Sequence, residues 1–234
     1  GHILTSQDGK TWKEVLTTKA RVNPVEYGNE RFVAGVSGYP AGKFLWSTDA
    51  ENWQEGIRLD DKQCTHFRRG AFGNSRFVIT GNHGGNSPSW IAVTSNGEDV
   101  LAIDHSLEKL REICFAEGVF VVVGEGIRHN SVDGINWKSS QVDPAEPLRW
   151  VVHNGTQFFC GGGKSVYVSD DGVNWDTHPM RPRGNVLWMN GEQAIATGWP
   201  GKMFYSADTG STWKQSAEMT PNGINVIVRA VQSH

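Results

Sequence analysis

Runs of three or four apolar residues recur along the chain, each preceded by a pair of turn-forming residues. In RFVAGV, for example, the run follows the turn pair Asn29-Glu30. The same arrangement begins at Gly28, Gly73, Ala116, His153, Met189 and Pro221. Asn-Gly and related pairs between apolar runs favour a β-hairpin, because both central residues of that turn adopt positive φ. Each repeat is therefore predicted to contain a hairpin.

A second pattern, Ser-x-Asp followed by glycine and tryptophan, follows each hairpin. SQDGKTW, STDAENW, SVDGINW, SDDGVNW and SADTGSTW occupy residues 6–12, 47–53, 131–137, 169–175 and 206–213. A degenerate copy, SNGEDVL, is placed at residues 95–101, where both the aspartate and the tryptophan are lost. The six serines stand 41, 48, 36, 38 and 37 residues apart. This regular spacing identifies a repeat protein.

Between the two patterns each repeat has a glycine-rich loop and another short strand, such as KFLWS at residues 43–47. A fourth strand is expected to begin at each tryptophan, which gives about four strands per repeat of roughly 40 residues, as in a propeller blade. A parallel βαβ repeat would need an amphipathic helix in every unit, and helix-like spacing occurs only at residues 98–113. The fold class is therefore all-β.

The two ends of the chain carry complementary halves of one repeat. The chain starts with ILTSQDGKTW, a second half, and finishes with PNGINVIVRAV, a first half. Strands from the two ends would together complete a blade and remove the free sheet edges of an open array. We predict a single six-bladed β-propeller domain over residues 1–234, with four-stranded blades and a last blade closed by the N- and C-terminal strands together.

Composition and charge exclude several classes of partner. With 22 Lys plus Arg against 25 Asp plus Glu, the net charge of -3 offers no basic field for nucleic acid. No apolar run approaches the ~20 residues of a membrane helix, so no membrane insertion is expected. No signal-peptide pattern is present either. Cys64, Cys114 and Cys160 lack Cys-x-x-Cys spacing and lie in apolar runs, so buried free thiols are favoured over a disulfide or a metal role.

The Ser-x-Asp copies resemble the Asp-box, or BNR repeat, of sialidases and related propellers, whose pattern is SxDGxxW or SxDxGxxW. The copy at Ser47 departs from it, because Ala50 replaces the glycine. The expected role is a turn in which Ser and Asp accept backbone N–H groups, Gly supplies positive φ and Trp covers the space between strands. The resemblance implies that these turns lie away from the functional face. The structural residues are Ser6, Asp8, Trp12, Ser47, Asp49, Trp53, Ser131, Asp133, Trp137, Ser169, Asp171, Trp175, Ser206, Asp208 and Trp213.

Chemistry is expected where the first strand of each blade begins, at the mouth of the central channel. Aligned on the turn pair, consecutive repeats place Arg69, Arg111 and Arg149 there. Arginine presents a planar fork of donors that binds carboxylates, so clustered arginines indicate an anionic ligand. The alternative is a solvated or internally paired ring of charges. In location only, the pattern resembles the arginine triad with which sialidases hold a carboxylate.

The loops between second and third strands open on the same predicted face. They end in Lys43, Lys164 and Lys202 and carry Tyr39, Trp90 and Trp199. An aromatic residue beside polar groups on a glycine-rich loop is suited to binding a sugar. The alternative is that each lysine only ends a tight turn with a soluble residue. GGGK at residues 161–164 is not a phosphate loop, because no helix follows it.

The leading hypothesis is a non-catalytic binding module for a glycan or another polar or anionic ligand, with no cofactor. A sialidase-like glycoside hydrolase is one alternative, but no tyrosine and glutamate nucleophile pair can be placed, and nothing singles out Asp104 or Glu112 as an acid. A protein-interaction scaffold is the other. The histidines are dispersed without HxH or HExxH spacing, so no metal site is expected. The resemblance also implies a secreted, periplasmic or cell-surface location.

Overall fold

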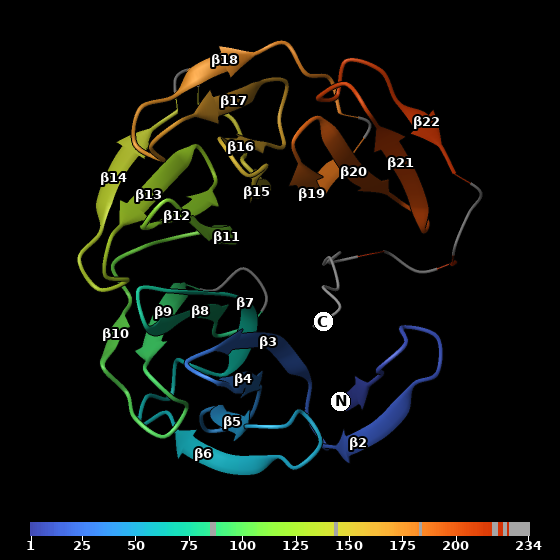
Figure 1. Ribbon diagram of the computed structural model, residues 1–234. Coiled ribbons are helices and arrows are strands. Elements are labelled where there is room, and N and C mark those ends of the chain that lie inside the picture. The colour runs from blue at the N-terminus through green and yellow to red at the C-terminus, as the bar shows by residue number, and fades with distance from the viewer. Residues whose placement is uncertain (85–87, 143–144, 183, 217–219, 222–223, 225–234) are drawn as a thin grey trace. The chain divides into compact units, whose positions relative to one another are not determined.

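The computed structural model describes residues 1–84, 88–142, 145–182, 184–216, 220–221 and 224 (Figure 1). Every regular element of this part of the chain is a β-strand. The strands form six sheets, five of four strands and one of two. The chain comprises two compact units, Gly1–Leu110 with Ser131–Trp137 and Arg111–Asn130 with Lys138–His234.

The first unit contains a two-stranded sheet and two four-stranded sheets. The pair is β1 (His2–Thr5) and β2 (Lys13–Thr17). The first four-stranded sheet is β3 (Val22–Gly28), β4 (Arg31–Val36), β5 (Lys43–Ser47) and β6 (Gln54–Arg58). The second is β7 (His66–Gly73), β8 (Arg76–Asn82), β9 (Ser89–Thr94) and β10 (Ala102–Asp104). In each sheet, strands that follow one another in sequence are hydrogen-bonded neighbours.

The remaining three sheets repeat the same order. They are β11 (Leu110–Ala116), β12 (Val119–Gly124), β13 (Ile127–Ser131) and β14 (Lys138–Gln141); β15 (Trp150–His153), β16 (Phe158–Gly161), β17 (Val166–Ser169) and β18 (Asp176–His178); and β19 (Asn185–Asn190), β20 (Gln193–Gly198), β21 (Lys202–Ser206) and β22 (Lys214–Gln215). The predicted fold class is confirmed: the chain is all-β and has the six-bladed β-propeller fold. The C-terminal half of the last blade, predicted from Pro221 onward, lies almost entirely outside the described residues.

Three of the predicted hairpin turns have the backbone that the sequence pattern predicts, whereas at Asn154-Gly155 and Asn190-Gly191 only the glycine has positive φ. Both central residues have positive φ at Asn29-Glu30 (47° and 58°), Asn74-Ser75 (46° and 60°) and Glu117-Gly118 (49° and 76°). This is the twist that joins two adjacent antiparallel strands with two residues. The helix-like spacing of residues 98–113 does not produce a helix; the segment contains β10 and the start of β11. Its apolar side chains serve sheet packing instead, and Ile103 packs against the core between the first two four-stranded sheets.

The cores of the first unit lie between successive sheets. Ile3 packs with Ala34, Val36 and Leu45 between the β1–β2 sheet and the β3–β6 sheet. The next interface is aromatic: the ring of Phe67 makes edge contacts with Phe44 at 5.4 Å and with Trp90 at 5.0 Å. Such edge-to-face pairs add to the free energy gained by burying apolar surface. In Figure 1, β7 lies beside β3 at this interface.

We call each Ser-x-Asp segment a Ser-Asp turn, and five of them share one network. In the turn at Ser169, the serine hydroxyl donates to Asp171 Oδ1 at 3.0 Å and accepts the N–H of Gly172 at 2.8 Å. Asp171 Oδ1 also accepts the N–H groups of Val173 and Asn174, each at 2.8 Å. The indole of Trp175 donates to the Gly172 carbonyl at 3.3 Å. The serine and the aspartate of this segment therefore build a turn.

Four of the five tryptophans close their turn with a hydrogen bond. Trp53, Trp137, Trp175 and Trp213 each donate the indole N–H to the carbonyl three residues earlier. Trp12 is different: it is 59% exposed, so its expected role of covering the space between strands does not hold. The aspartates of the turns have lowered pKa values because backbone and side-chain donors surround the carboxylate, as at Asp171, where the pKa falls to about 2.

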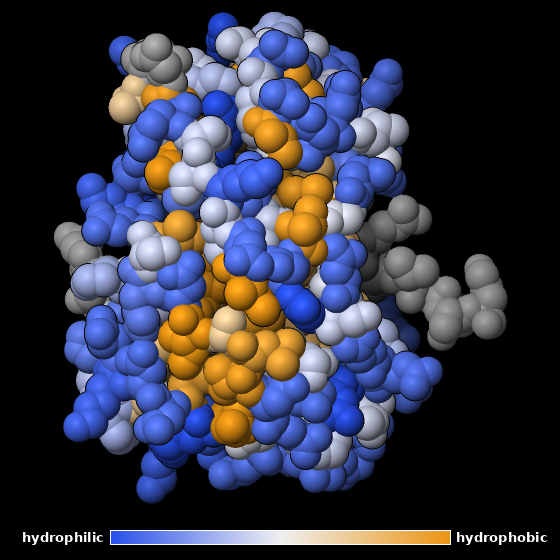
Figure 2. All heavy atoms as spheres, turned by 90° about the vertical axis from the view of Figure 1, so that its left-hand side faces the viewer, coloured by the Kyte–Doolittle hydropathy of each residue, from blue (hydrophilic) through white to orange (hydrophobic). Residues whose placement is uncertain are grey.

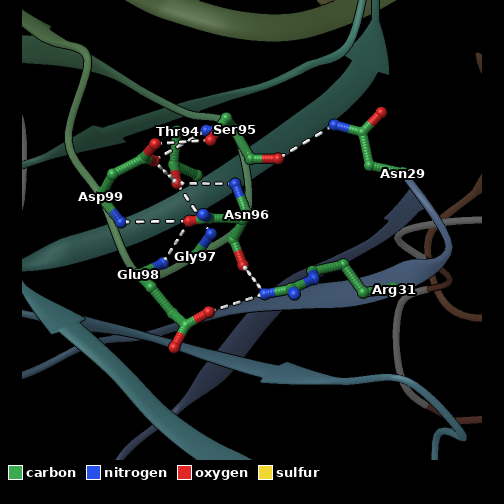
Figure 3. Close-up of polar contacts among 8 residues, drawn as sticks. All are labelled: Asn29, Arg31, Thr94, Ser95, Asn96, Gly97, Glu98 and Asp99. Carbon is green, nitrogen blue, oxygen red and sulfur yellow. Dashed lines mark hydrogen bonds and ion pairs between the residues drawn. The ribbon is translucent and has the colours of Figure 1, made fainter.

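The degenerate third copy is a Ser-Asp turn whose register starts one residue earlier than the sequence suggested. Thr94 Oγ1 accepts the N–H of Gly97 at 2.8 Å, as the serine does elsewhere (Figure 3). Asn96 Oδ1 accepts the N–H groups of Glu98 (2.7 Å) and Asp99 (3.2 Å), as the aspartate does elsewhere. The turn is therefore Thr94–Val100 and not 95–101, with Thr for Ser, Asn for Asp and Val100 for Trp. Val100 packs against the aromatic core in place of the indole.

The surface is mainly hydrophilic on the side shown in Figure 2, with apolar areas among charged and polar side chains, the largest of them in the lower half of the view. Large exposed apolar residues of the first unit include Leu101 and Val132. Among the described residues, no helix has the length and apolarity that crossing a bilayer requires. Many apolar side chains of the described residues are instead buried, and clusters of them pack between neighbouring sheets.

Candidate functional site

A cleft of about 780 Å³ opens in the first unit, between the β1–β2 sheet and the β3–β6 sheet. One wall is the end of β2 and the segment that follows it. The other is the loop between β4 and β5 together with parts of β5 and β6. We call it the Tyr39 cleft; it is lined by residues 16–20, 36–39, 41–43, 45, 53–55 and 58. Its volume lies within the ~300–1,000 Å³ of typical ligand pockets.

The Tyr39 cleft combines an apolar floor with basic walls. Leu45 and Trp53 belong to the neighbouring core and its margin. Lys43 forms an ion pair with Glu55, which lowers the pKa of that carboxyl, while Arg58 Nη1 donates to the Ala41 carbonyl at 2.7 Å. These contacts hold both cations against the cleft wall. Tyr39 is 72% exposed, so its ring is available to a ligand.

Beyond Tyr39 the surface becomes strongly basic. Arg21 precedes β3, and His66, Arg68 and Arg69 lie on β7; with His83 they form what we call the arginine–histidine cluster. The Tyr39 ring makes edge contacts with the rings of His66 (6.0 Å) and His83 (6.5 Å). Tyr39 therefore connects the cleft with the cluster, and both lie within the first unit.

An irregular strand positions the arginines. The pairing of β7 with β8 shifts register between Phe67 and Arg69, which makes Arg68 the extra residue of a bulge. Asn23 of β3 donates its side-chain amide to the Arg68 carbonyl that the bulge leaves unpaired. Arg68 Nη2 donates to Asn82 Oδ1 at 3.3 Å. Because of the bulge, the side chains of these two consecutive arginines do not follow the regular alternation between the two faces of the sheet.

The cations of this cluster act on one another. The pKa of Arg68 is lowered by burial and by the neighbouring charges of Arg21 and Arg69. The pKa of His66 is lowered by burial and then by Arg68, His83 and Arg21. No ion pair joins Arg21 or Arg68 to a carboxylate of the described residues. A bound anion would relieve this repulsion.

The three arginines predicted at the channel mouth fall in different environments. Arg69 belongs to the arginine–histidine cluster of the first unit, whereas Arg111 and Arg149 belong to the second. Arg111 donates twice to Glu125 Oε1, at 2.9 and 2.7 Å, and so is internally paired. Arg149 is exposed, and its backbone N–H donates to Gly161.

The loop residues predicted as a sugar platform also divide. Trp90 is a correction: it is fully buried in the aromatic core and has no face for a ligand. Trp90 lies on β9, and all six residues of this strand are buried. The strand therefore begins before Trp90, which the prediction had placed on the preceding loop. Trp199 is 74% exposed on the loop before Lys202, the first residue of β21. Tyr39 and Lys43 both line the Tyr39 cleft.

Lys164 lies on a loop that a carboxylate organises. Glu146 Oε2 accepts the N–H of Lys164 (2.6 Å) and of Ser165 (3.2 Å), and Oε1 accepts the hydroxyl of Tyr167 at 2.7 Å. The sequence alone placed no tyrosine–glutamate pair. The pair exists, but Tyr167 is buried, and its pKa is raised by burial and by Glu146. A buried, neutral phenol is not an activated nucleophile.

Arg21 and His66 were not predicted as site residues. Arg21 lies outside the position at which the repeats were aligned, and His66 was counted among dispersed histidines. Only their convergence in space with Tyr39 and Arg68 gives them a role. The sequence contained one signal, the adjacent pair Arg68 and Arg69. A regular strand would direct two adjacent side chains to opposite faces.

No protein-family model matches the sequence. No curated protein matches it either. Among solved structures, YCF48 bound to D1 peptide aligns at a TM-score of 0.64 and 21% identity, over 89% of this chain and 73% of that one. YCF48 from Cyanidioschyzon merolae aligns at 0.62 and 16%, over 89% and 76%. A chain of the nidogen/laminin complex aligns at 0.56 and 14%, over 83% and 79%. At these identities the similarity shows the fold, and the fold that this chain shares with them is the β-propeller.

Proposed function

We propose that the protein is a non-catalytic binding module that receives an acidic peptide segment of a protein partner. The segment lies along the Tyr39 cleft and places a carboxylate on the arginine–histidine cluster. The observation that carries the proposal is the crowding of Arg21, Arg68, Arg69 and His66, in which burial and then neighbouring cations lower the pKa values of Arg68 and His66. Such a cluster binds carboxylates through charge-assisted hydrogen bonds.

The cleft supports a peptide rather than a sugar as the ligand. Its floor is apolar at Leu45 and Trp53, which suits side chains of an extended segment. The predicted sugar platform has lost Trp90 to the core. The propeller bound to D1 peptide and the propeller of the nidogen/laminin complex are each described with a protein or peptide partner, which makes this use of the fold reasonable.

The chemistry of a sialidase-like hydrolase has less support. It needs a nucleophile and an acid on opposite sides of a sugar carbon. In the pair that the described residues form, Tyr167 is buried, and half-buried Glu146 holds the loop of Lys164. The basic cluster therefore suits binding of an anion without turnover. A secreted or cell-surface location, implied by the Asp-box resemblance, remains part of this proposal.

The test is binding of fluorescent acidic peptides, measured by anisotropy at two salt concentrations. We expect binding that weakens with salt and falls at least about tenfold in the double variant Arg21→Gln/Arg68→Gln, because two charge-assisted contacts are lost. Arg181→Gln, an exposed arginine of the second unit, is the matched control. Equal binding of the same peptide with Gln in place of Glu, or equal binding by the double variant, would contradict the proposal. Binding of carboxylated glycans in place of the peptides would keep the site and change the ligand.

A further inference from the structure

Three potential metal ligands from two sheets meet on the first unit, outside the site described above. Asp61 and Cys64 lie on the connection between β6 and β7, and His105 follows β10. The ligand atoms of the three side chains lie within 4.8 Å of one another. His105 Nε2 is 2.7 Å from Asp61 Oδ2. Asp61 and His105 are 44 positions apart in sequence. For this reason no closely spaced motif indicated a metal site.

The backbone fixes the two ligands of the connection before any ion binds. Asp61 Oδ1 accepts the N–H of Gln63 at 2.8 Å, and the Asp61 carbonyl accepts the N–H of Cys64 at 3.0 Å. The Cys64 carbonyl accepts the N–H of Gly42 at 2.8 Å, which ties this turn to the loop of the first four-stranded sheet. A ligand set held by its own backbone loses little entropy on binding.

The polar groups of the cluster are incompletely satisfied. His105 Nδ1 is buried and has no hydrogen-bond partner among the described residues. Cys64 is fully buried, and its sulfur lies beside the carboxylate of Asp61 and the imidazole of His105.

We propose that Asp61, Cys64 and His105 bind a Zn²⁺ ion. Carboxylate, thiolate and imidazole are the ligands that zinc takes in proteins, and three protein ligands with one open position, filled by water, give tetrahedral coordination. On binding, the Cys64 sulfur forms a bond to the ion and its proton leaves to solvent. The hydrogen bond between Asp61 and His105 is replaced by bonds from each to the ion.

The ion would join two neighbouring blades at one edge. Asp61 and Cys64 follow the last strand of the β3–β6 sheet, and His105 follows the last strand of the β7–β10 sheet. A bond network that ties these connections together stabilises the folded state, since the unfolded chain does not present the three ligands in one place. Binding of the ion therefore stabilises the folded chain, and the inference is independent of the peptide site.

The experiment is titration of the reduced full-length protein with Co²⁺, which replaces Zn²⁺ and reports its ligands by absorption. We expect visible bands of tetrahedral cobalt and a thiolate charge-transfer band in the near ultraviolet, both removed by one equivalent of Zn²⁺. We also expect a higher melting temperature with Zn²⁺ that a chelator reverses. The Cys64→Ser variant should lose the charge-transfer band, and His105→Gln should lose the tetrahedral bands.

Cys160→Ser is the matched control, because Cys160 is also fully buried with a thiol pKa raised to about 12. It should leave all the cobalt bands in place. If the wild-type protein shows no charge-transfer band, or if the band survives in Cys64→Ser, the site does not exist as proposed. If Cys64→Ser does not fold, Asp61→Asn provides the second variant, and an unchanged cobalt spectrum there would also overturn the assignment.

Discussion

The guanidinium of Arg31 donates from Nη1 to the backbone carbonyl of Asn96 at 3.1 Å, joining the hairpin of one blade to the Ser-Asp turn of the next (Figure 3). The same nitrogen is 2.9 Å from Glu98 Oε2. One blade further on, Arg76 makes the same contact with the carbonyl of Asp133, at 2.6 Å. Two residues before each arginine, Asn29 and Asn74 donate to the carbonyl one position earlier in the same turns. A repeated Asn-x-Arg motif therefore fastens successive blades.

We predict that replacing either arginine by methionine destabilises the protein by about 1–2 kcal/mol, because a turn carbonyl loses a charge-assisted donor while the apolar stem is kept. Urea unfolding measures the change. The effects of Arg31→Met and Arg76→Met should be nearly additive, since each contacts a different turn. Arg21→Met, whose side chain lies on the exposed basic cluster, is the control and should change stability little. Equal losses at all three positions would refute an interblade role.

The Ser-Asp turns show how far sequence alone could go. Five turns were placed correctly because Ser, Asp and Trp are distinctive letters at fixed spacing. The third was placed one residue late, because Ser95 matched the letter while Thr94 performs the chemistry. A threonine hydroxyl and an asparagine carbonyl offer the same acceptors as serine and aspartate. The position of the third turn is therefore set by which side chains can accept hydrogen bonds, and matching residue types alone did not identify it.

The second Ser-Asp turn carries a strained residue that can be relieved. Ala50 has a φ of 60° where the turns at Ser6, Ser131 and Ser169 have glycine at the same position. A non-glycine residue in this region costs about 1 kcal/mol. We expect Ala50→Gly to stabilise the protein by ~0.5–1 kcal/mol in thermal or urea unfolding, although added freedom of the unfolded chain offsets part of the gain. A decrease in stability would show that the methyl group of Ala50 contributes more than its φ costs.

The converse substitutions separate strain from packing. Gly9 and Gly172 have φ values of 68° and 71°, but a Cβ on Gly9 meets nothing within 4 Å, whereas one on Gly172 would lie 2.7 Å from Val121 Cγ2. Gly9→Ala should therefore cost about 1 kcal/mol from the backbone alone. Gly172→Ala should cost at least about 1 kcal/mol more, because Val121 must move. Equal costs in unfolding experiments would show that the interface around Val121 yields easily.

The candidate site was less predictable from sequence than the turns. Of the residues predicted for the site, Arg111 is paired with Glu125 and Trp90 is buried. Arg21 and His66 come from different blades and share no motif. Which loop residues converge depends on bulges such as the one at Arg68, and a bulge leaves no distinctive letter in the sequence. Repeat spacing specifies strands, whereas the site depends on departures from the repeat.

The carboxylate of Asp171 makes the stability of its turn dependent on pH. Its folded pKa of about 2 is below the ~3.9 of an unfolded aspartate, so its contribution is present above about pH 4 and lost as pH falls through the folded value. Asp171→Asn keeps the acceptor oxygen, as Asn96 does in the third turn. We expect this variant to be less stable at pH 7 by on the order of 1 kcal/mol and the difference to shrink between pH 4 and pH 2.5. A constant difference across that range in urea unfolding would contradict the assignment.

The imidazole of His66 reports on the arginine–histidine cluster. Its folded pKa is lowered by burial and by Arg68, His83 and Arg21, so NMR titration should place it below the ~6.5 of an unfolded histidine. The unfolded chain then binds the proton more readily, and stability should fall as pH decreases through 6.5 toward the folded value.

Removing one neighbouring charge should move that pKa in a defined direction. Arg68→Gln removes a cation that disfavours protonation, so the pKa of His66 should rise, while the control Arg181→Gln should leave it unchanged. A saturating acidic peptide should raise the pKa for the same reason, because a bound carboxylate stabilises the imidazolium. If the peptide binds and the pKa of His66 does not move, the carboxylate does not reach this cluster and the ligand occupies another part of the cleft. A rise that disappears in Arg21→Gln/Arg68→Gln would place the carboxylate among these cations.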